Sequence, residues 1–318
     1  MLKFLYRHNK DYSRYNIIKA LTKDLELSSD IYILMPFSKN QFIKNFFKRN
    51  RIINDFFISN YDTYIYDRQK IKKSNPRAWW KYFQDWINFR FSHYLLSDTQ
   101  HHFEYWEKLF GKYKGKHFVL PVLADKEIYF PNQDAPVNQP IKILFYGSFI
   151  PLHGIDIILK AFKLLENKGL DFEANIIGTG QTYKKMLQLY QDLDLKNVYM
   201  NGQVIDEIKL ANEIRNADII LGIFGNSQKA LSVIPNKVYQ ALACQKLIIT
   251  METKAILEFF TENDLVFSKN SEESLAETIF DLSIDSNKRK IISENGYKSF
   301  IQLYDKTEKE FRSFIKSI

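Results

Sequence analysis

In the second half of the chain, short apolar runs alternate with amphipathic stretches. The apolar runs predict strands at 141–147, 173–178, 197–202, 218–224, 246–250 and 265–268. Between them, apolar residues recur at helical spacing, which predicts helices near 154–168, 182–193, 206–216, 236–244 and 253–261. Regular alternation of strand and helix is typical of a parallel sheet with helices on both faces.

The first half of the chain follows the same pattern less regularly. Predicted strands lie at 2–6, 31–36, 61–67, 93–99 and 117–122, and predicted helices at 12–26, 39–50, 77–91 and 100–112. A polar segment with three prolines, 130–140, predicts an interdomain linker. After the last strand, 286–317 is helical, and its end has the pattern of an amphipathic helix that packs onto the body.

These patterns divide the chain into an N-terminal α/β domain (1–138), a second α/β domain (139–303) and a C-terminal amphipathic helix (304–318). Open α/β sheets bind ligands at the carboxyl ends of their strands. We therefore expect two Rossmann-like domains that face each other across a ligand-binding cleft.

Composition narrows the functional classes. A single cysteine, Cys244, excludes an internal disulfide framework and any cysteine-based metal cluster, and it favours a reducing compartment. No apolar run approaches the roughly 18 residues of a membrane span, and the N-terminus lacks a signal-peptide core. We expect a cytoplasmic protein that meets a membrane only at its surface.

The charge of the chain is unevenly distributed. The net charge of +8 combines +9 in residues 1–138 with −1 in the remainder. This asymmetry favours an anionic partner of the first domain, such as a membrane surface, a lipid phosphate or a nucleic acid. Segments 40–57 and 77–91 interleave basic and aromatic residues, as interfacial membrane helices do, although core-facing aromatics give the same spacing. No nucleic-acid-binding module is recognisable, and we expect no nucleic-acid partner.

Glycine follows three of the predicted strands in the second domain. Gly147 and Gly154 flank the loop after the first strand, Gly178 and Gly180 follow the second, and 222–230 leads into the helix start SVIPNKVYQALA (232–243). Glycine lets the backbone come close to a ligand, and a helix N-terminus favours an anion. Strand ends on one edge of a sheet converge, so these loops predict one binding crevice.

Residues 141–268 resemble the donor-binding domain of GT-B glycosyltransferases, particularly family 4 and its relatives. The resemblance rests on a Gly-x-x-x-Pro-x-x-Gly loop, a Gly-x-Gly turn, a Pro-x-Lys helix start and an Ala-x-Ala-Cys segment before an apolar strand. These motifs fall at Gly147, Pro151, Gly154, Gly178, Gly180, Pro235, Lys237 and 241–250.

The resemblance implies a nucleotide-sugar donor, UDP- or GDP-linked, whose diphosphate is held where the loops meet a helix N-terminus. It implies no cofactor, no metal ion and retention of anomeric configuration. The implied donor-binding residues are Gly147, Ser148, His153, Gly154, Gly178, Gly180, Lys229, Pro235, Asn236 and Gln240, and Lys237 is also a catalytic candidate. For each lysine, a solvated surface position is the alternative.

The sequence departs from the family at several positions. Ser232 and Gln240 stand where family 4 commonly has two glutamates, and Ser148 and His153 replace a basic pair. His153 could protonate beside a diphosphate, since the histidine pKa lies near neutrality. The departures leave two interpretations open: an active transferase with a different donor, or a catalytically inactive binding or partner subunit.

On the acceptor side, the resemblance favours polar residues at strand ends of the first domain. Asp67, the second catalytic candidate, and Arg68 end one predicted strand, while Thr99 and His101 follow another. A turn-capping aspartate is the alternative for Asp67, and the pair His101–His102 is interpreted as a surface feature of a helix start rather than a metal site. The sequence thus predicts transfer of a sugar to a glycan or lipid-linked acceptor, in surface polysaccharide or glycoconjugate synthesis at the inner face of the plasma membrane.

Overall fold

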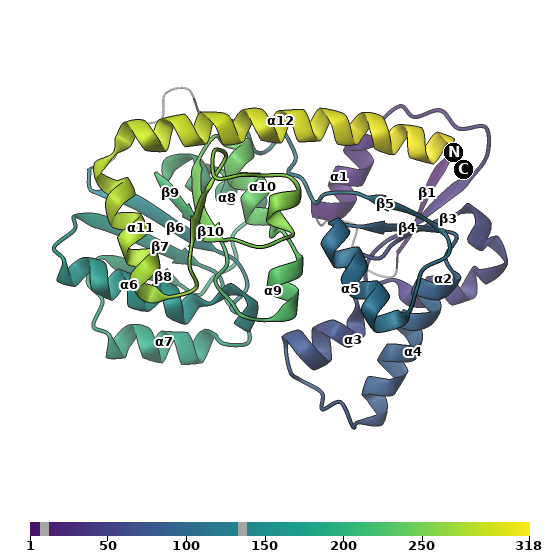
Figure 1. Ribbon diagram of the computed structural model, residues 1–318, viewed down its shortest axis with the longest axis horizontal. Helices are drawn as coiled ribbons and strands as arrows, with labels where there is room; N and C mark the ends of the chain where they lie inside the picture. The colour runs from purple at the N-terminus through teal and green to yellow at the C-terminus, as the bar shows by residue number, and fades with distance from the viewer. Residues whose placement is uncertain (7–12, 133–138) are drawn as a thin grey trace. The chain divides into compact units, whose positions relative to one another are not determined.

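The computed structural model describes residues 1–6, 13–132 and 139–318, so part of the predicted linker, 133–138, lies outside the described residues. The chain divides into two compact units (Figure 1). The first consists of Met1–Leu123, Ser232–Ile234 and Leu303–Ile318, and the second of Ala124–Leu231 and Pro235–Gln302.

The first unit contains a five-stranded parallel sheet in the order β1-β2-β3-β4-β5. Its strands are β1 (Leu2–Leu5), β2 (Ile31–Leu34), β3 (Ile52–Asp55), β4 (Tyr94–Ser97) and β5 (Lys116–Val119). The main helices are α1 (Ser13–Leu21), α2 (Lys39–Lys44), α4 (Pro76–Phe91) and α5 (Gln100–Phe110). Aromatic rings from α4, α5 and the residue after β3 form one buried cluster of this core, which includes Phe56, Phe89 and Trp106.

The second unit contains a six-stranded parallel sheet in the order β11-β10-β9-β6-β7-β8. The strands are β6 (Ile141–Tyr146), β7 (Phe172–Ile177), β8 (Val198–Asn201), β9 (Ile219–Leu221), β10 (Leu247–Met251) and β11 (Val266–Ser268). The helices are α6 (Ile155–Asn167), α7 (Tyr183–Asp192), α8 (Glu207–Asn216), α9 (Gln228–Ser232), α10 (Asn236–Ala243) and α11 (Glu272–Ile284). Helices α6 and α11 pack together, as do α8 and α10 (Figure 1). Both units are Rossmann-like, which confirms the predicted fold class.

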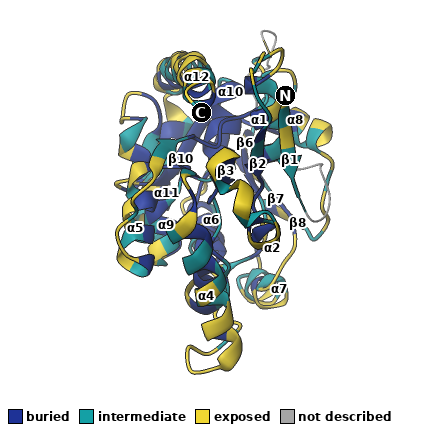
Figure 2. Cartoon of the chain, turned by 90° about the vertical axis from the view of Figure 1, so that its right-hand side faces the viewer, coloured by how far each residue is buried: buried dark blue, intermediate teal, exposed yellow. Residues whose placement is uncertain are grey.

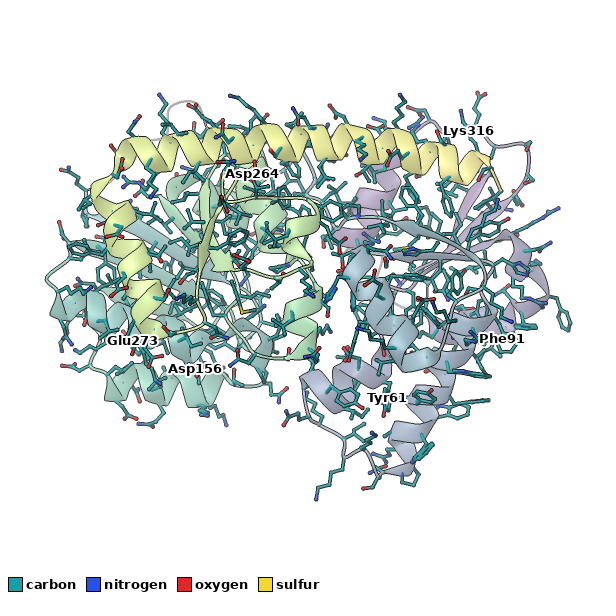
Figure 3. The ribbon with its side chains drawn as sticks, in the orientation of Figure 1. Tyr61, Phe91, Asp156, Asp264, Glu273 and Lys316 are labelled. Carbon is teal, nitrogen blue, oxygen red and sulfur yellow. The ribbon has the colours of Figure 1, made fainter. Side chains whose placement is uncertain are left out.

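One predicted strand of the first unit is wrong. Residues 61–67 are helical, as α3 (Asn60–Asp62) and a π-helical turn (Thr63–Asp67). The alternation in YDTYIYD imitates a strand, but Ser59 Oγ accepts a hydrogen bond from Asp62 N and caps a helix start. The ring of Tyr61, labelled in Figure 3, packs 5.2 Å from that of Tyr82. The missing strand is β3, hidden inside the basic and aromatic segment 40–57, and all four of its residues are buried.

In the second half, one predicted helix is wrong and two helices were not predicted. The predicted helix at 253–261 is a set of turns with a 3-10 helix at Ile256–Glu258. Helices α9 and α11 lie in segments for which the sequence predicted no helix. Helix α11 carries a start signal in the sequence, because Ser271 caps it and two glutamates occupy its first turn.

The last helix, α12 (Ser286–Lys316), matches the prediction, and its final turns pack within the first unit. Phe314 stacks on Phe118 with ring centroids 5.1 Å apart, and Phe311 is fully buried. Arg312 donates hydrogen bonds to the carbonyl oxygens of Leu21 and Lys23. The alternation of charged and apolar residues at the chain end therefore produces the expected packing face.

A buried ion pair ties α1 to the sheet of the first unit. The guanidinium of Arg14 donates two parallel hydrogen bonds to Asp55, at 2.9 and 3.0 Å, and both side chains are almost fully buried. Its remaining N–H groups reach the carbonyl oxygens of Leu120 and Pro121, at 2.8 and 3.0 Å. This geometry satisfies both charges in a dry environment, where loss of one partner is costly.

We predict that Asp55→Ala destabilises the protein by about 3–5 kcal/mol, because it leaves the Arg14 cation buried and uncompensated. Urea unfolding followed by circular dichroism measures the change. Asp30→Ala is the matched control, since Asp30 pairs with Lys3 at the exposed surface and its removal should barely move the transition. Equal midpoints for the two variants would contradict the assignment.

Candidate functional site

The glycine-containing loops of the second unit touch one another through their backbones. A methyl group on Gly178 would lie 2.0 Å from the carbonyl oxygen of Gly147. One on Gly154 would lie 2.5 Å from the carbonyl carbon of Phe224. Gly147, Gly154 and Gly178 all have positive φ, so both space and conformation require glycine there.

Hydrogen bonds join the same loops. Phe149 N donates to Thr179 O at 2.9 Å, which links the loop after β6 to the loop after β7. Phe224 N donates to His153 O at 3.1 Å, which links the loop after β6 to the loop after β9. The three loops therefore form one framework at the carboxyl edge of the sheet, as the positions of the glycines indicated.

Lys237, in the first turn of α10, extends into this framework and is 4% exposed. Its Nζ donates to Gly222 O at 3.3 Å and lies 3.8 Å from the ring centroid of Phe145. No carboxylate among the described residues forms an ion pair with it. Burial lowers the pKa of Lys237 well below its ordinary value. An anion bound beside Nζ would supply the negative charge that no carboxylate provides there.

His153 lies next to this lysine. A methyl group on Gly147 would meet His153 Cε1 at 3.0 Å and Lys237 Nζ at 3.5 Å. Burial lowers the pKa of His153 well below its ordinary value, and the Lys237 charge lowers it further. These shifts favour the neutral ring in the free protein, and protonation of His153 beside a diphosphate stays a prediction.

The tautomer of His153 follows from its partner. Nδ1 lies 2.5 Å from Ser148 O, and a carbonyl oxygen can only accept, so Nδ1 carries the proton. The neutral ring then presents Nε2 as a hydrogen-bond acceptor, suited to a hydroxyl group rather than to a phosphate oxygen.

Gln240, one turn further along α10, bridges two buried tyrosines. Its Oε1 accepts from Tyr146 OH at 2.9 Å and its Nε2 donates to Tyr129 OH at 2.8 Å. Tyr129 OH in turn donates to Glu207 Oε1 at 3.2 Å. A neutral amide fits between two hydroxyl groups because it both accepts and donates.

Most of the other donor-side positions are more exposed than Lys237. Ser148 is exposed, and Pro235 and Asn236 are partly exposed at the start of α10. Lys229 lies partly exposed on α9, and Ser232 ends that helix with its side chain buried. The structure thus brings the glycines, His153 and Lys237 together, with Ser148 beside them through its bond to His153.

The predicted acceptor-side residues belong to the first unit. Asp67 is buried at the end of the π-helical turn and Arg68 follows it, so neither ends a strand. Thr99 is fully buried; its Oγ1 accepts from His102 N and donates to Ser232 O at 3.0 Å. His101 is partly exposed in the first turn of α5.

Sequence patterns did not reveal two buried polar pairs of the first unit. His102 is fully buried, contrary to its assignment to the surface, with Nδ1 2.5 Å from Asp98 Oδ1. Lys39 Nζ lies 3.1 Å from Asp85 Oδ1 and 3.4 Å from the Phe56 ring centroid. The spacing of four residues between Asp98 and His102 is the signal that could have indicated the first pair.

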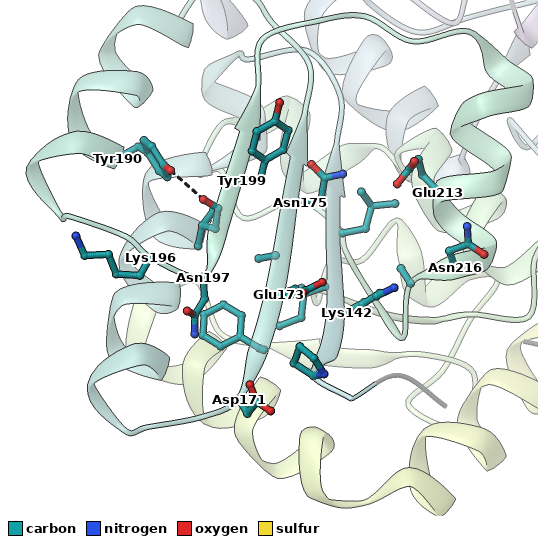
Figure 4. A pocket seen from close by; sticks show the side chains of 17 residues that line it. Lys142, Asp171, Glu173, Asn175, Tyr190, Lys196, Asn197, Tyr199, Glu213 and Asn216 are labelled. Atoms are coloured by element: carbon teal, nitrogen blue, oxygen red, sulfur yellow. Dashed lines mark hydrogen bonds between the residues drawn. The ribbon is translucent and has the colours of Figure 1, made fainter. Parts of the chain in front are cut away.

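Two hollows of the second unit are lined by neither Lys237 nor His153. One, of about 890 Å³, lies over β6, β7 and β8 and is lined by side chains such as Lys142, Asn175 and Tyr199 (Figure 4). A smaller one, about 290 Å³, adjoins the glycine loops at Pro151, Gly154 and Gly225. Gly154 belongs both to the glycine loops and to the lining of this smaller hollow, so we place the candidate site at the glycine loops around Lys237.

Within 1–6, 13–132 and 139–318, no group of three or more His, Cys, Asp or Glu side chains is placed to hold a metal ion. In the same part of the chain, no helix has the length and apolar character needed to cross a membrane.

Comparison with protein families places these features in a known group. The family model described as "Glycosyl transferases group 1" matches residues 125–299. A glycosyltransferase of Methanocaldococcus jannaschii is 27% identical over 186 residues, which cover 58% of this chain and 48% of that protein. Protein CapJ of Staphylococcus aureus is 28% identical over 92 residues, 28% of this chain and 23% of that protein. The chain thus spans half or less of these relatives' lengths.

Solved structures share the fold at low identity. Sucrose-phosphate synthase from Thermosynechococcus elongatus has a TM-score of 0.70 at 13% identity, covering 98% of this chain and 80% of that one. HepE of Anabaena, in complex with UDP-glucose, has a TM-score of 0.68 at 12% identity, covering 95% and 82%. TarM of S. aureus, solved as a variant with UDP, has a TM-score of 0.65 at 11% identity, covering 94% and 58%.

We predict that the His153 imidazole stays neutral at pH 6, because burial and the Lys237 charge lower its pKa. A pH titration of the histidine ring resonances by NMR measures this, with free histidine in the same buffer as reference. Lys237→Met should raise the His153 pKa by removing the nearby charge. A His153 resonance that titrates at the reference pH would contradict the description.

Proposed function

The chain belongs to the glycosyl transferases of group 1, and from this we propose that it moves a sugar from a UDP- or GDP-linked donor to a glycan or lipid-linked acceptor. The donor diphosphate would bind at the glycine loops of the second unit, beside Lys237. HepE and TarM, which share the fold, were solved with UDP-glucose and UDP, which supports a nucleotide-sugar as donor.

The observation that carries the proposal is the buried lysine without a carboxylate. A cation in a dry site costs free energy unless an anion compensates it. Lys237 Nζ meets only a carbonyl oxygen and aromatic rings among the described residues. A diphosphate at this position would accept charge-assisted hydrogen bonds from Nζ and would relieve the cost.

The proposed reaction breaks the bond between the anomeric carbon and the donor phosphate oxygen. The acceptor hydroxyl oxygen forms the new bond on the same face of the sugar, and its proton passes to the leaving phosphate. Lys237 would stabilise the negative charge that develops on that phosphate. Its ammonium can do this without a metal ion, so we propose a metal-independent transfer, and the family resemblance supports retention of configuration.

Neighbouring residues would position the sugar. Neutral His153 offers Nε2 as acceptor to a sugar hydroxyl. Gln240 is held by two tyrosines, which leaves one amide hydrogen and one oxygen lone pair for the donor nucleoside. In the first unit, Asp67 and Arg68 remain candidates for the acceptor side, with Asp67 the proposed contact to the reacting sugar.

We further propose a role in bacterial surface polysaccharide or glycoconjugate synthesis, in the cytoplasm at the inner face of the plasma membrane. A lipid-linked acceptor would be available there, and the basic first unit suits such a location.

A second candidate function is a binding or partner subunit without catalysis. Ser232 and Gln240 favour it, because neither supplies the carboxylate expected of family 4. The two candidates differ in turnover, since both bind a nucleotide but only the enzyme hydrolyses or transfers a donor sugar.

The decisive experiment combines thermal shift with donor turnover. UDP, GDP and their monophosphates are compared as ligands, and the nucleotide of the strongest ligand then defines a panel of nucleotide-sugars for hydrolysis assays. A shift with a diphosphate and slow release of sugar supports the transferase. A shift without turnover of any donor supports the subunit, and no shift at millimolar nucleotide would refute both.

We predict that Lys237→Met weakens binding of the nucleoside diphosphate at least tenfold, since hydrogen bonds to charged groups contribute about 1.5–3 kcal/mol. The free variant should be at least as stable as the original protein, because methionine removes an uncompensated buried charge at similar volume. Calorimetric titration and thermal unfolding measure the two effects.

Lys209→Met is the matched control for Lys237→Met, since Lys209 is exposed on α8 and should change neither binding nor stability. If Lys237→Met unfolded the free protein, or left nucleotide affinity intact, the role given to this lysine would be wrong.

We predict that Gln240→Glu destabilises the protein by about 1–3 kcal/mol at pH 7, since it removes the amide donor to Tyr129 and buries a carboxylate. Urea unfolding measures the loss, with exposed Gln203→Glu as control. Full stability of Gln240→Glu would show that the tyrosine bridge does not require a neutral amide.

A further inference from the structure

The first unit carries a surface on which aromatic and basic side chains are exposed together. We define the aromatic–basic surface as the exposed side chains of residues 37–51 and 70–91, on α2, the 3-10 helix after it (Phe46–Arg51) and α4 with its preceding loop. Phe47 is 98% exposed, and Trp79 and Trp80 are 69% and 62% exposed. Figure 2 shows the start of α4 and the loop before it as exposed. Large aromatic side chains gathered at such exposure mark an interaction site.

The rings of this surface form a continuous series across two elements. Along α4, Trp80, Phe83 and Trp86 follow one another with centroids 6.3 and 6.0 Å apart. Phe91, at the end of α4 and labelled in Figure 3, lies 5.7 Å from Trp86 and 6.0 Å from Phe46. The patch is therefore one surface rather than scattered exposed residues.

Charge on this part of the chain is almost entirely positive at the surface. Residues 37–92 contain twelve Lys and Arg against four Asp and no Glu, a net +8 that equals the net charge of the whole chain. Eleven of the twelve cations are exposed or partly exposed, and all four aspartates are buried. No carboxylate of this segment therefore faces solvent to weaken its attraction for an anionic surface.

Three of these aspartates have polar partners beneath the surface. Asp55 pairs with Arg14, and Asp85 lies beside Lys39 and accepts hydrogen bonds from Ser59 Oγ and Tyr61 N. Asp62 accepts from Tyr105 OH. Meanwhile the apolar residues that the core needs are supplied by other aromatics of the same segment, such as Phe42 and Phe89, which are fully buried. Some aromatic rings of this segment thus pack in the core, and others are exposed as in an interfacial membrane helix.

We propose that the aromatic–basic surface docks the first unit onto an anionic lipid bilayer. Tryptophan and phenylalanine side chains would enter the headgroup region while lysine and arginine side chains meet lipid phosphates. Of the exposed rings, Phe37 and Trp80 adjoin a hollow of about 420 Å³, whereas Phe47 and Trp79 lie outside its lining. The inference adds a membrane partner to the proposed function but stands on a different surface from the nucleotide site.

Vesicle co-sedimentation of the full chain tests the proposal. Vesicles of phosphatidylcholine with phosphatidylglycerol should bind the protein, and vesicles of phosphatidylcholine should not. Binding should weaken as salt rises, since screening shortens the reach of the charges. An absence of binding to the anionic vesicles at low salt would overturn the proposal.

Two variants separate the contributions. Phe47→Ser/Trp79→Ser/Trp80→Ser removes exposed rings and should abolish the salt-resistant part of binding. Lys44→Gln/Lys48→Gln/Arg51→Gln should reduce partitioning on the order of a hundredfold, because each cation near an anionic membrane contributes about fivefold.

The matched control is Tyr199→Ser/Val204→Ser/Ile208→Ser, which removes three comparably exposed apolar side chains from the second unit and should bind vesicles normally. Equal loss in the control would overturn the assignment of the surface.

A parallel binding assay with single-stranded RNA and DNA oligonucleotides at the same ionic strength excludes the other polyanion. Tight oligonucleotide binding without vesicle binding would overturn the proposal in favour of a nucleic acid. Thermal shift with nucleoside diphosphates is measured on every variant and should be unchanged, so failure of membrane docking is distinguishable from failure of the proposed transfer function.

Discussion

The chemistry of the second unit depends on one uncompensated charge. Lys237 reaches the inner side of three loops and finds there a carbonyl oxygen and aromatic rings instead of a carboxylate. The loops can surround it because Gly147, Gly154 and Gly178 allow their backbones to touch. The fold therefore buries an amine whose charged form is costly in the free protein, and an anion that binds beside it stabilises that charged form.

The neighbours of this lysine are neutral for the same reason. A protonated His153 would add a second buried charge, and burial with the nearby lysine prevents it. Gln240 accepts a hydrogen bond from Tyr146 OH and donates one to Tyr129 OH, whereas a carboxylate could only accept. Where family 4 commonly has a glutamate, the structure thus has a neutral amide, Gln240, whose oxygen and nitrogen both have hydrogen-bond partners.

Much of the fold could be predicted from the sequence, because βα alternation repeats a simple hydrophobic period. The errors fell where local signals compete: YDTYIYD alternates like a strand but is capped as a helix by Ser59, and β3 is four residues long within a basic segment. In the site, the glycines, His153 and Lys237 could be located by motif. The tyrosine partners of Gln240 and the burial of His102 could not, because they depend on contacts between residues distant in sequence.

The final turns of α12 have a consequence for how the protein is made. Phe311, Phe314 and Arg312 complete the first unit by covering Phe118 and binding the carbonyl oxygens of Leu21 and Lys23. These residues leave the ribosome after those of the second unit, whereas Leu21 and Phe118 leave it before them. Synthesis of the first unit thus begins earlier, but that unit cannot finish folding until the second unit has been synthesised, so the second unit can form its core first.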